Sequence, residues 1–99
     1  MIPWHIEYDE KGAPWVHIEL RSAPLWIVES YLVKLGGRVV ERERQVQGDG
    51  WVAHLREGES VALGSLRIGR GWLDIWGEDA AALEALMSRL GWMLMRGGG

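Results

Sequence analysis

The apolar residues near the C-terminal end of this chain lie on one face of a predicted helix. Their spacing of three and four residues defines a long stripe, formed by Leu83, Leu86, Met87, Leu90 and Leu94. Asp79 is the predicted N-cap, because its carboxylate can accept hydrogen bonds from the free backbone amides of the first turn. A helix with such a stripe needs an apolar surface to cover, and we expect the residues before it to supply one.

Apolar and polar residues alternate in two stretches near the N-terminus, residues 4–9 and 15–21, which predicts two strands. Turn-forming residues lie between them, so we expect an antiparallel hairpin. Pairing Tyr8 with Val16 matches apolar with apolar side chains and charged with oppositely charged ones. The polar face of this hairpin would then collect His5, Glu7, His17 and Glu19. These residues could hold a zinc-type ion, but cross-strand pairing of opposite charges explains them without a metal and is the favoured interpretation.

A shorter helix is predicted over residues 24–35, with Pro24 in its first turn and two glycines after its end. Four short strands follow, at residues 39–47, 51–56, 61–68 and 72–76, and the third is bent or interrupted at Gly64. The order β-β-α-β-β-β-β-α predicts the α+β class. We expect a two-layer sandwich, in which an antiparallel sheet of about five to six strands carries both helices on one face.

Four residues of the predicted strands belong to the sheet face without helices. If Leu73 and Ile75 point toward the helices, their neighbours point away, and Trp15 alternates with apolar residues in the same manner. The predicted patch comprises Trp15, Trp72, Asp74 and Trp76. An exposed aromatic patch marks a surface for a partner or ligand. The alternative is that the two faces are inverted and these tryptophans belong to the core.

The composition narrows the function classes. Ninety-nine residues, of which 47% are hydrophobic, predict one domain over residues 1–99. The net charge of −3, without a basic block, argues against nucleic acid as a partner. The chain has no cysteine and no apolar run near the roughly 20 residues of a membrane span, so we expect a soluble cytoplasmic protein without membrane contact. No nucleophile–base pair or phosphate-binding loop is recognisable, so we expect neither catalysis nor a cofactor.

In element order, size and its Trp- and Arg-rich composition, the stretch 15–96 resembles a small TATA-binding-protein-like α+β domain. More narrowly, it is similar to the domain at the C-terminal end of thermophilic proteins related to the molybdopterin-synthase small subunit. The resemblance implies an α+β fold and an association with cofactor sulfur chemistry, and it implies no site residues. The chain also ends in Gly97, Gly98 and Gly99, which resembles the Gly-Gly terminus of ubiquitin-like sulfur carriers.

Three functional hypotheses follow. The first is a non-catalytic accessory domain that associates with a protein through the tryptophan patch, with a homodimer as the expected form because soluble proteins most often form symmetric oligomers. The second is a sulfur carrier or molybdenum-cofactor-related protein that acts through Gly98 and Gly99. The third is a domain that binds a small ligand or a metal.

Overall fold

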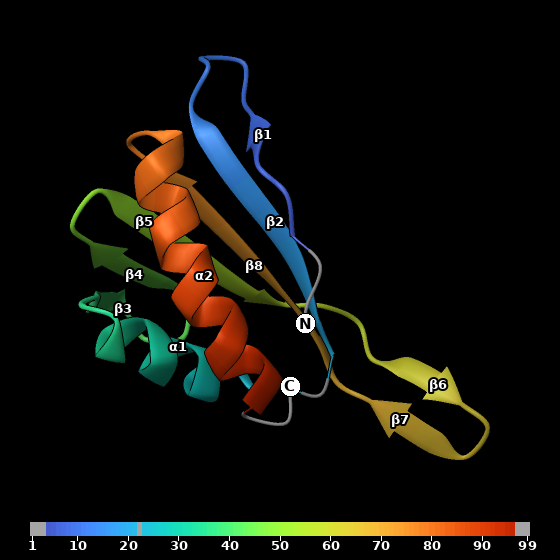
Figure 1. The fold of residues 1–99 in the computed structure, drawn as a ribbon. Helices are drawn as coiled ribbons and strands as arrows, with labels where there is room; N and C mark the ends of the chain where they lie inside the picture. Colours follow the sequence, from blue (N-terminus) through green and yellow to red (C-terminus); the bar gives the residue numbers. More distant parts are fainter. Residues whose placement is uncertain (1–3, 22, 97–99) are drawn as a thin grey trace.

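The computed structural model describes residues 4–21 and 23–96 as an α+β two-layer sandwich, which confirms the predicted fold class (Figure 1). Within these residues, six strands form one antiparallel sheet in the order β1-β2-β8-β5-β4-β3. They are β1 (Glu7–Tyr8), β2 (Pro14–Arg21), β3 (Arg38–Glu41), β4 (Gln45–Gly48), β5 (Trp51–Glu57) and β8 (Arg70–Gly77). Strand β8 lies near the centre of the sheet and pairs on one side with β2 of the N-terminal hairpin and on the other with β5.

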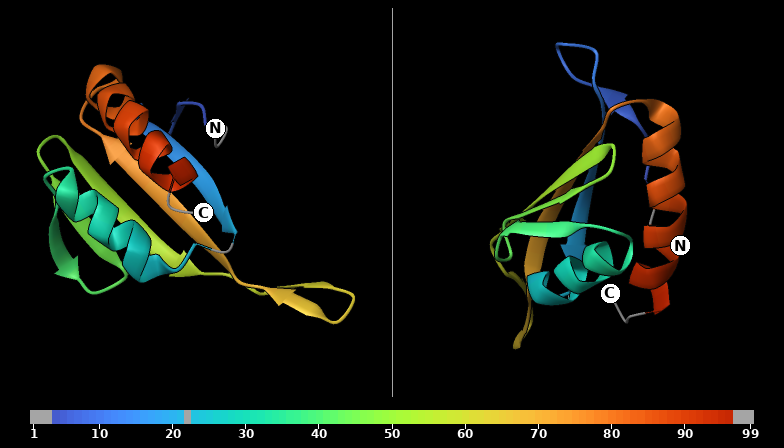
Figure 2. Two further views of the ribbon diagram at one scale, coloured as in Figure 1. Left: turned by 60° about the horizontal axis from the view of Figure 1, so that its bottom comes forward. Right: turned by 90° about the vertical axis from the view of Figure 1, so that its left-hand side faces the viewer.

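Both helices, α1 (Leu25–Lys34) and α2 (Ala80–Arg96), cover the same face of the sheet, as Figure 2 shows in its right-hand view. Helix α2 packs on β2 and β8, and α1 packs on β3, β4 and β5. Neither helix that the structure describes combines the length and hydropathy needed to cross a membrane.

The core lies between the helices and the sheet. All five residues of the predicted α2 stripe are buried, and α1 contributes Leu25, Val28 and Leu32. The sheet contributes alternate residues of its strands, namely Val16, Ile18, Leu20, Val46, Trp51, Ala53, Leu55, Leu73 and Ile75. Burial of each large aliphatic side chain favours folding by about 1.5–3 kcal/mol. At the start of α2, the Ala82 amide donates to Oδ1 of Asp79 at 2.8 Å, which confirms the predicted N-cap.

The register of the N-terminal hairpin differs from the prediction. The structure pairs Tyr8 with Pro14 and Glu7 with Trp15, so the strands are offset by two residues from the predicted pairing of Tyr8 with Val16. An offset of two residues leaves every side chain on its predicted face, because side chains alternate with a period of two. Trp4 and Ile6 accordingly pack against the core, while Tyr8 is exposed.

The single strand predicted at residues 39–47 is two strands joined by a turn, β3 and β4. Glu29 of α1 is almost completely buried, and its Oε2 accepts a hydrogen bond of 2.5 Å from the backbone amide of Glu43 in this turn. Its Oε1 lies 3.2 Å from Nε of Arg42. Glu43 has φ of 57°, the left-handed conformation that side chains disfavour. A contact from α1 thus stabilises a turn that lacks the usual turn residues.

The two remaining strands, β6 (Val61–Leu63) and β7 (Leu66–Ile68), pair only with each other. They form a ribbon that projects from the body of the molecule, and we call residues 58–69 the arm (Figure 1). The third predicted strand is therefore a hairpin outside the main sheet. The arm gives the molecule its long dimension of 43 Å, against 26 and 24 Å in the other two directions.

Candidate interaction face of the sheet

The sheet face opposite the helices carries the four predicted patch residues, and we call it the open face. Trp15 lies on β2, and Trp72, Asp74 and Trp76 lie on β8. Each of these residues alternates with a buried residue of the helix-covered face. The three indoles are half-buried rather than enclosed, so the inverted arrangement, with the tryptophans in the core, is wrong.

The aromatic rings of the open face stack on one another across neighbouring strands. Trp15 stacks on Trp76 with ring centroids 6.0 Å apart. The imidazole of His17 stacks on Trp72 at 5.0 Å, and His54 of β5 meets the Trp76 ring edge-on at 5.3 Å. Aromatic pairs at these separations attract each other beyond their burial. The rings therefore form a continuous, mutually supported layer over three strands.

Asp74 places a carboxylate in the centre of this layer. Its Oδ1 accepts a hydrogen bond from Nε1 of Trp15 at 3.1 Å and is also in hydrogen-bond contact with Nδ1 of His17. Only 9% of Asp74 is exposed, so these two partners supply the hydrogen bonds that water would otherwise make. Because an ionised carboxylate only accepts hydrogen bonds, we assign a proton to Nδ1 of His17, which leaves Nε2 for other contacts.

Two arginine side chains lie over the ring of Trp72. The guanidinium carbon of Arg70 lies 4.8 Å from the centroid of the Trp72 ring, and that of Arg56 lies 5.6 Å from it. Both distances are within the range of cation–π attraction. The ring also lies against Gly58, where an added Cβ would be 2.8 Å from Nε1 of Trp72. A glycine at this position therefore lets the indole lie flat at the base of the arm.

Glu19 joins two arginines at the edge of the patch. Nε of Arg21 donates to Oε1 of Glu19 at 2.9 Å, and Nε of Arg70 donates to Oε2 at 2.6 Å. The hydrogen bond from Arg21 foremost, and that from Arg70, hold the pKa of the Glu19 carboxyl below its ordinary value, against the opposing effect of desolvation. Glu19 therefore neutralises part of the positive charge around Trp72.

The four residues predicted as metal ligands do not converge. His5 lies 3.3 Å from Glu7 in an exposed pair, whereas His17 contacts Asp74 and Glu19 contacts the two arginines. The predicted pairing of His5 with Glu19 and of Glu7 with His17 fails because the hairpin register is offset. Among residues 4–21 and 23–96, no three His, Asp or Glu side chains lie close enough to share a metal ion.

The structure adds residues that the patch prediction did not include. His17, Arg70 and Arg56 contact the aromatic layer directly, as does His54. His17 lies two residues from Trp15 on β2, and Arg70 lies two residues from Trp72 on β8, so strand alternation alone could have placed these two on the open face. Within the described residues, His17 contacts the Asp74 carboxylate and His54 meets the Trp76 ring.

The predicted tail residues, Gly98 and Gly99, lie outside the described residues. What the structure places before them is α2, which is helical up to Arg96. In ubiquitin-like sulfur carriers a strand leads into the glycine tail, and the chain differs from them in this respect.

The protein is an open-faced α+β sandwich of two layers. Both helices cover one side of the sheet, and the other side presents an aromatic, charged surface. A family model described as archaeal MoaD-like protein matches residues 16–99. The match spans most of the chain, and the chain belongs to the archaeal MoaD-like protein family. This match is consistent with the relation to the molybdopterin-synthase small subunit that the sequence resemblance implied. A comparison with curated proteins found no match.

Proposed function

We propose that this protein is a non-catalytic association domain that binds another protein through the open face. The observation that carries the proposal is the layer of Trp15, Trp72 and Trp76 with Arg56 and Arg70 on an uncovered sheet surface. Tryptophan and arginine are the residues most enriched among those that dominate the energy of protein interfaces. The resemblance to TATA-binding-protein-like domains stays a prediction.

The arrangement of the side chains supports binding of a protein rather than burial in the core. The rings are held in place by stacking and by the Asp74 hydrogen bonds, so few rotamers remain to be ordered on association. Preorganised side chains lower the entropic cost of binding. The arginines beside Trp72 favour a partner surface that combines apolar groups with a carboxylate, because guanidinium groups bind carboxylates bidentately.

The test compares two tryptophan variants. Trp76→Arg adds a charge to the open face, and Trp92→Arg makes the same change at an exposed position of α2, on the opposite side of the molecule. Partners that co-purify with the tagged wild-type chain from its native cells are identified, and their affinities are measured with purified components. We expect the Trp92 variant to bind as wild type does and the Trp76 variant to bind at least tenfold more weakly. Equal affinities for both variants, with the folds intact, would exclude the open face.

A second candidate function is a sulfur carrier or a molybdenum-cofactor-related protein. Membership of the archaeal MoaD-like family favours it, together with the glycines at the C-terminal end of the sequence. In this function, an activating enzyme would join the carboxylate of Gly99 to AMP from ATP and release pyrophosphate, and hydrosulfide would then displace AMP from the acyl adenylate to leave a thiocarboxylate. Mass spectrometry of the chain after incubation with such an enzyme, ATP and a sulfur donor tests this function. A chain of unchanged mass would exclude it.

A further inference from the structure

The arm has one apolar face and one polar face. The β6–β7 register pairs Val61 with Ile68 and Leu63 with Leu66. Because alternate residues share a face, these four side chains lie on the same side of the ribbon, and Ala62 and Arg67 lie on the other. Leu63 is 57% exposed and Leu66 is 60% exposed. The tip of the arm therefore presents a cross-strand leucine pair to solvent.

A ribbon of this kind needs a covering surface. A two-stranded hairpin is marginally stable in water by itself, and an antiparallel sheet normally buries its apolar face. Figures 1 and 2 show the ribbon projecting away from both helices and from the main sheet. Within the described part of the chain, β6 and β7 pair only with each other. Among the residues that the structure describes, no other strand pairs with the ribbon, so its apolar face is available to another molecule.

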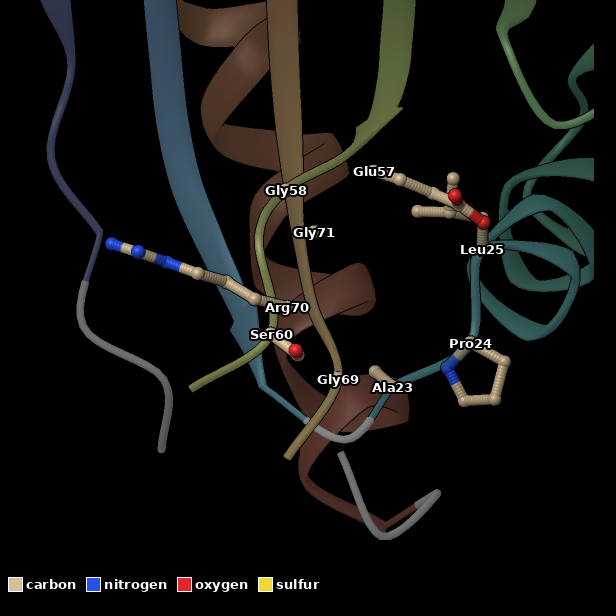
Figure 3. Close-up of a pocket in the computed structure, with 9 residues that line it drawn as sticks. All are labelled: Ala23, Pro24, Leu25, Glu57, Gly58, Ser60, Gly69, Arg70 and Gly71. Atoms are coloured by element: carbon tan, nitrogen blue, oxygen red, sulfur yellow. The ribbon is translucent and has the colours of Figure 1, made fainter. Parts of the chain in front are cut away.

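A cleft of about 410 Å³ lies at the base of the arm (Figure 3). Ala23, Pro24 and Leu25, at the start of α1, line one side, and the glycines at positions 58, 69 and 71 line the other. Figure 3 shows the Arg70 side chain extending away from Pro24 and Leu25. The cleft is thus open and has apolar side chains on one wall, while Glu57, Ser60 and Arg70 also belong to its lining. Its volume is large enough for leucine side chains.

We propose that the arm is a dimerisation element whose occupant is a second copy of this chain. Two arms related by a two-fold axis lie antiparallel, with their apolar faces in contact. Because the arms have the same length, the tip of each one then reaches the base of the other. The leucine pair of one copy covers Val61 and Ile68 of its partner and reaches the partner's cleft.

Three features favour a second copy over a different protein. The projecting leucines and the cleft that accepts them occur on the same chain, so one symmetric contact satisfies both surfaces twice. The charged residue of the ribbon, Arg67, lies on the polar face, where it hydrogen-bonds Oγ of Ser60 at 3.0 Å, and so it stays outside the contact. The open face is not used, so a dimer formed through the arms leaves the surface of the proposed function free for a different protein.

Sedimentation equilibrium of Leu66→Ser and Val40→Ser tests the contact. Val40 is similarly exposed, at 52%, but lies on β3 in the main sheet. We expect wild type and Val40→Ser to dimerise, and Leu66→Ser to dissociate about 100-fold more readily, because the change removes two buried leucines from each dimer. Circular dichroism and thermal unfolding establish that each variant retains its fold. A monomeric wild type at all concentrations, or a dimer unaffected by Leu66→Ser, would overturn the proposal.

A cross-linking experiment tests whether the tip of one arm lies at the base of the arm of the second copy. The chain has no cysteine, so Ala23→Cys and Leu66→Cys each carry a single thiol. When the two variants are mixed and treated with a short bis-maleimide, we expect a cross-linked dimer that contains one chain of each. Val40→Cys replaces Leu66→Cys in the control, and we expect no product there. A dimer that Trp76→Arg dissociates and Leu66→Ser does not would overturn the arm proposal, while the open face would remain an association surface.

Discussion

Asp74 brings a carboxylate into a sheet face made largely of indole rings, where it is almost shielded from solvent. Burial of such a group is unfavourable unless its oxygens accept hydrogen bonds. Trp15 and His17 supply them, and both residues come from the neighbouring strand β2. The polar centre therefore also fixes the orientation of two rings that take part in stacking. Asp74 therefore helps to order the side chains of the open face, although little of its own surface is exposed.

Replacement of Asp74 by alanine should lower the free energy of unfolding by about 1–3 kcal/mol, because the half-buried Nε1–H of Trp15 loses its acceptor. Asp74→Asn should cost less, since an amide oxygen can still accept from Trp15. Urea unfolding at neutral pH measures both changes. Asp49→Ala, at an exposed residue of the turn between β4 and β5, is the control, and we expect it to change stability by less than about 0.5 kcal/mol. A similar loss at both positions would contradict this role of Asp74.

Glu19 should make the stability of the protein depend on pH in the acid range. Its pKa is lowered in the folded state, so the unfolded chain binds the proton more readily. The ion pairs with Arg21 and Arg70 therefore contribute stability above the ordinary carboxyl pKa of about 4.3, and this contribution is lost as the pH falls through the folded-state pKa. We expect wild type to be more stable than Glu19→Gln at pH 7, with the difference shrinking as the pH falls below the ordinary carboxyl pKa and through the lowered folded-state pKa of Glu19. A difference that is constant with pH would contradict the assignment.

At the scale of elements, α2 depends on both its apolar stripe and its first turn. The Asp79 carboxylate accepts a hydrogen bond from the Ala82 amide, and negative charge at a helix N-terminus also interacts favourably with the helix dipole. Asp79→Ala should therefore cost about 0.5–2 kcal/mol of unfolding free energy, measured by urea denaturation. Asp79→Ser, which keeps an N-cap acceptor, should recover most of the loss. Equal stability of the alanine and serine variants would show that the cap is not what stabilises this end of α2.

The elements that could be predicted from the sequence are those whose signal is local. The α2 stripe and the alternation in β2 and β8 depend only on spacing, and they placed the core and the three tryptophans on the correct sides. The turn between β3 and β4 was missed because Glu29, distant in sequence, stabilises it. The register of the first hairpin was wrong because an offset of two residues leaves every side chain on the same face, so alternation does not distinguish the two registers. His54 and Arg56 could not be assigned to the patch from the sequence, because their place beside it depends on the pairing of β5 with β8. The spacing of residues within one strand does not show which strands pair.

At the scale of the whole molecule, the body and the arm are separate in their packing. Among the described residues, every fully buried core side chain comes from the six-stranded sheet or the two helices. The β5–β8 pairing extends to Glu57 and Gly71, and the Gly58 amide donates to the Arg70 carbonyl at 2.8 Å beyond it. Hydrogen bonds between β5 and β8 therefore close the body up to Gly58, the first residue of the arm.

Replacement of residues 59–69 by Asn-Gly should leave the body folded. Gly58 and Arg70 lie opposite each other at the end of a hairpin, and Asn-Gly between them favours the two-residue turn that joins such strands. We expect the unfolding free energy of this shortened chain to remain within about 1 kcal/mol of that of the monomeric Leu66→Ser variant, because the replaced segment contributes no side chain to the core. Urea unfolding measures the difference, and sedimentation should show a monomer. Loss of cooperative unfolding would mean that the arm contributes to the fold itself, in which case its exposed leucines could not be assigned to association alone.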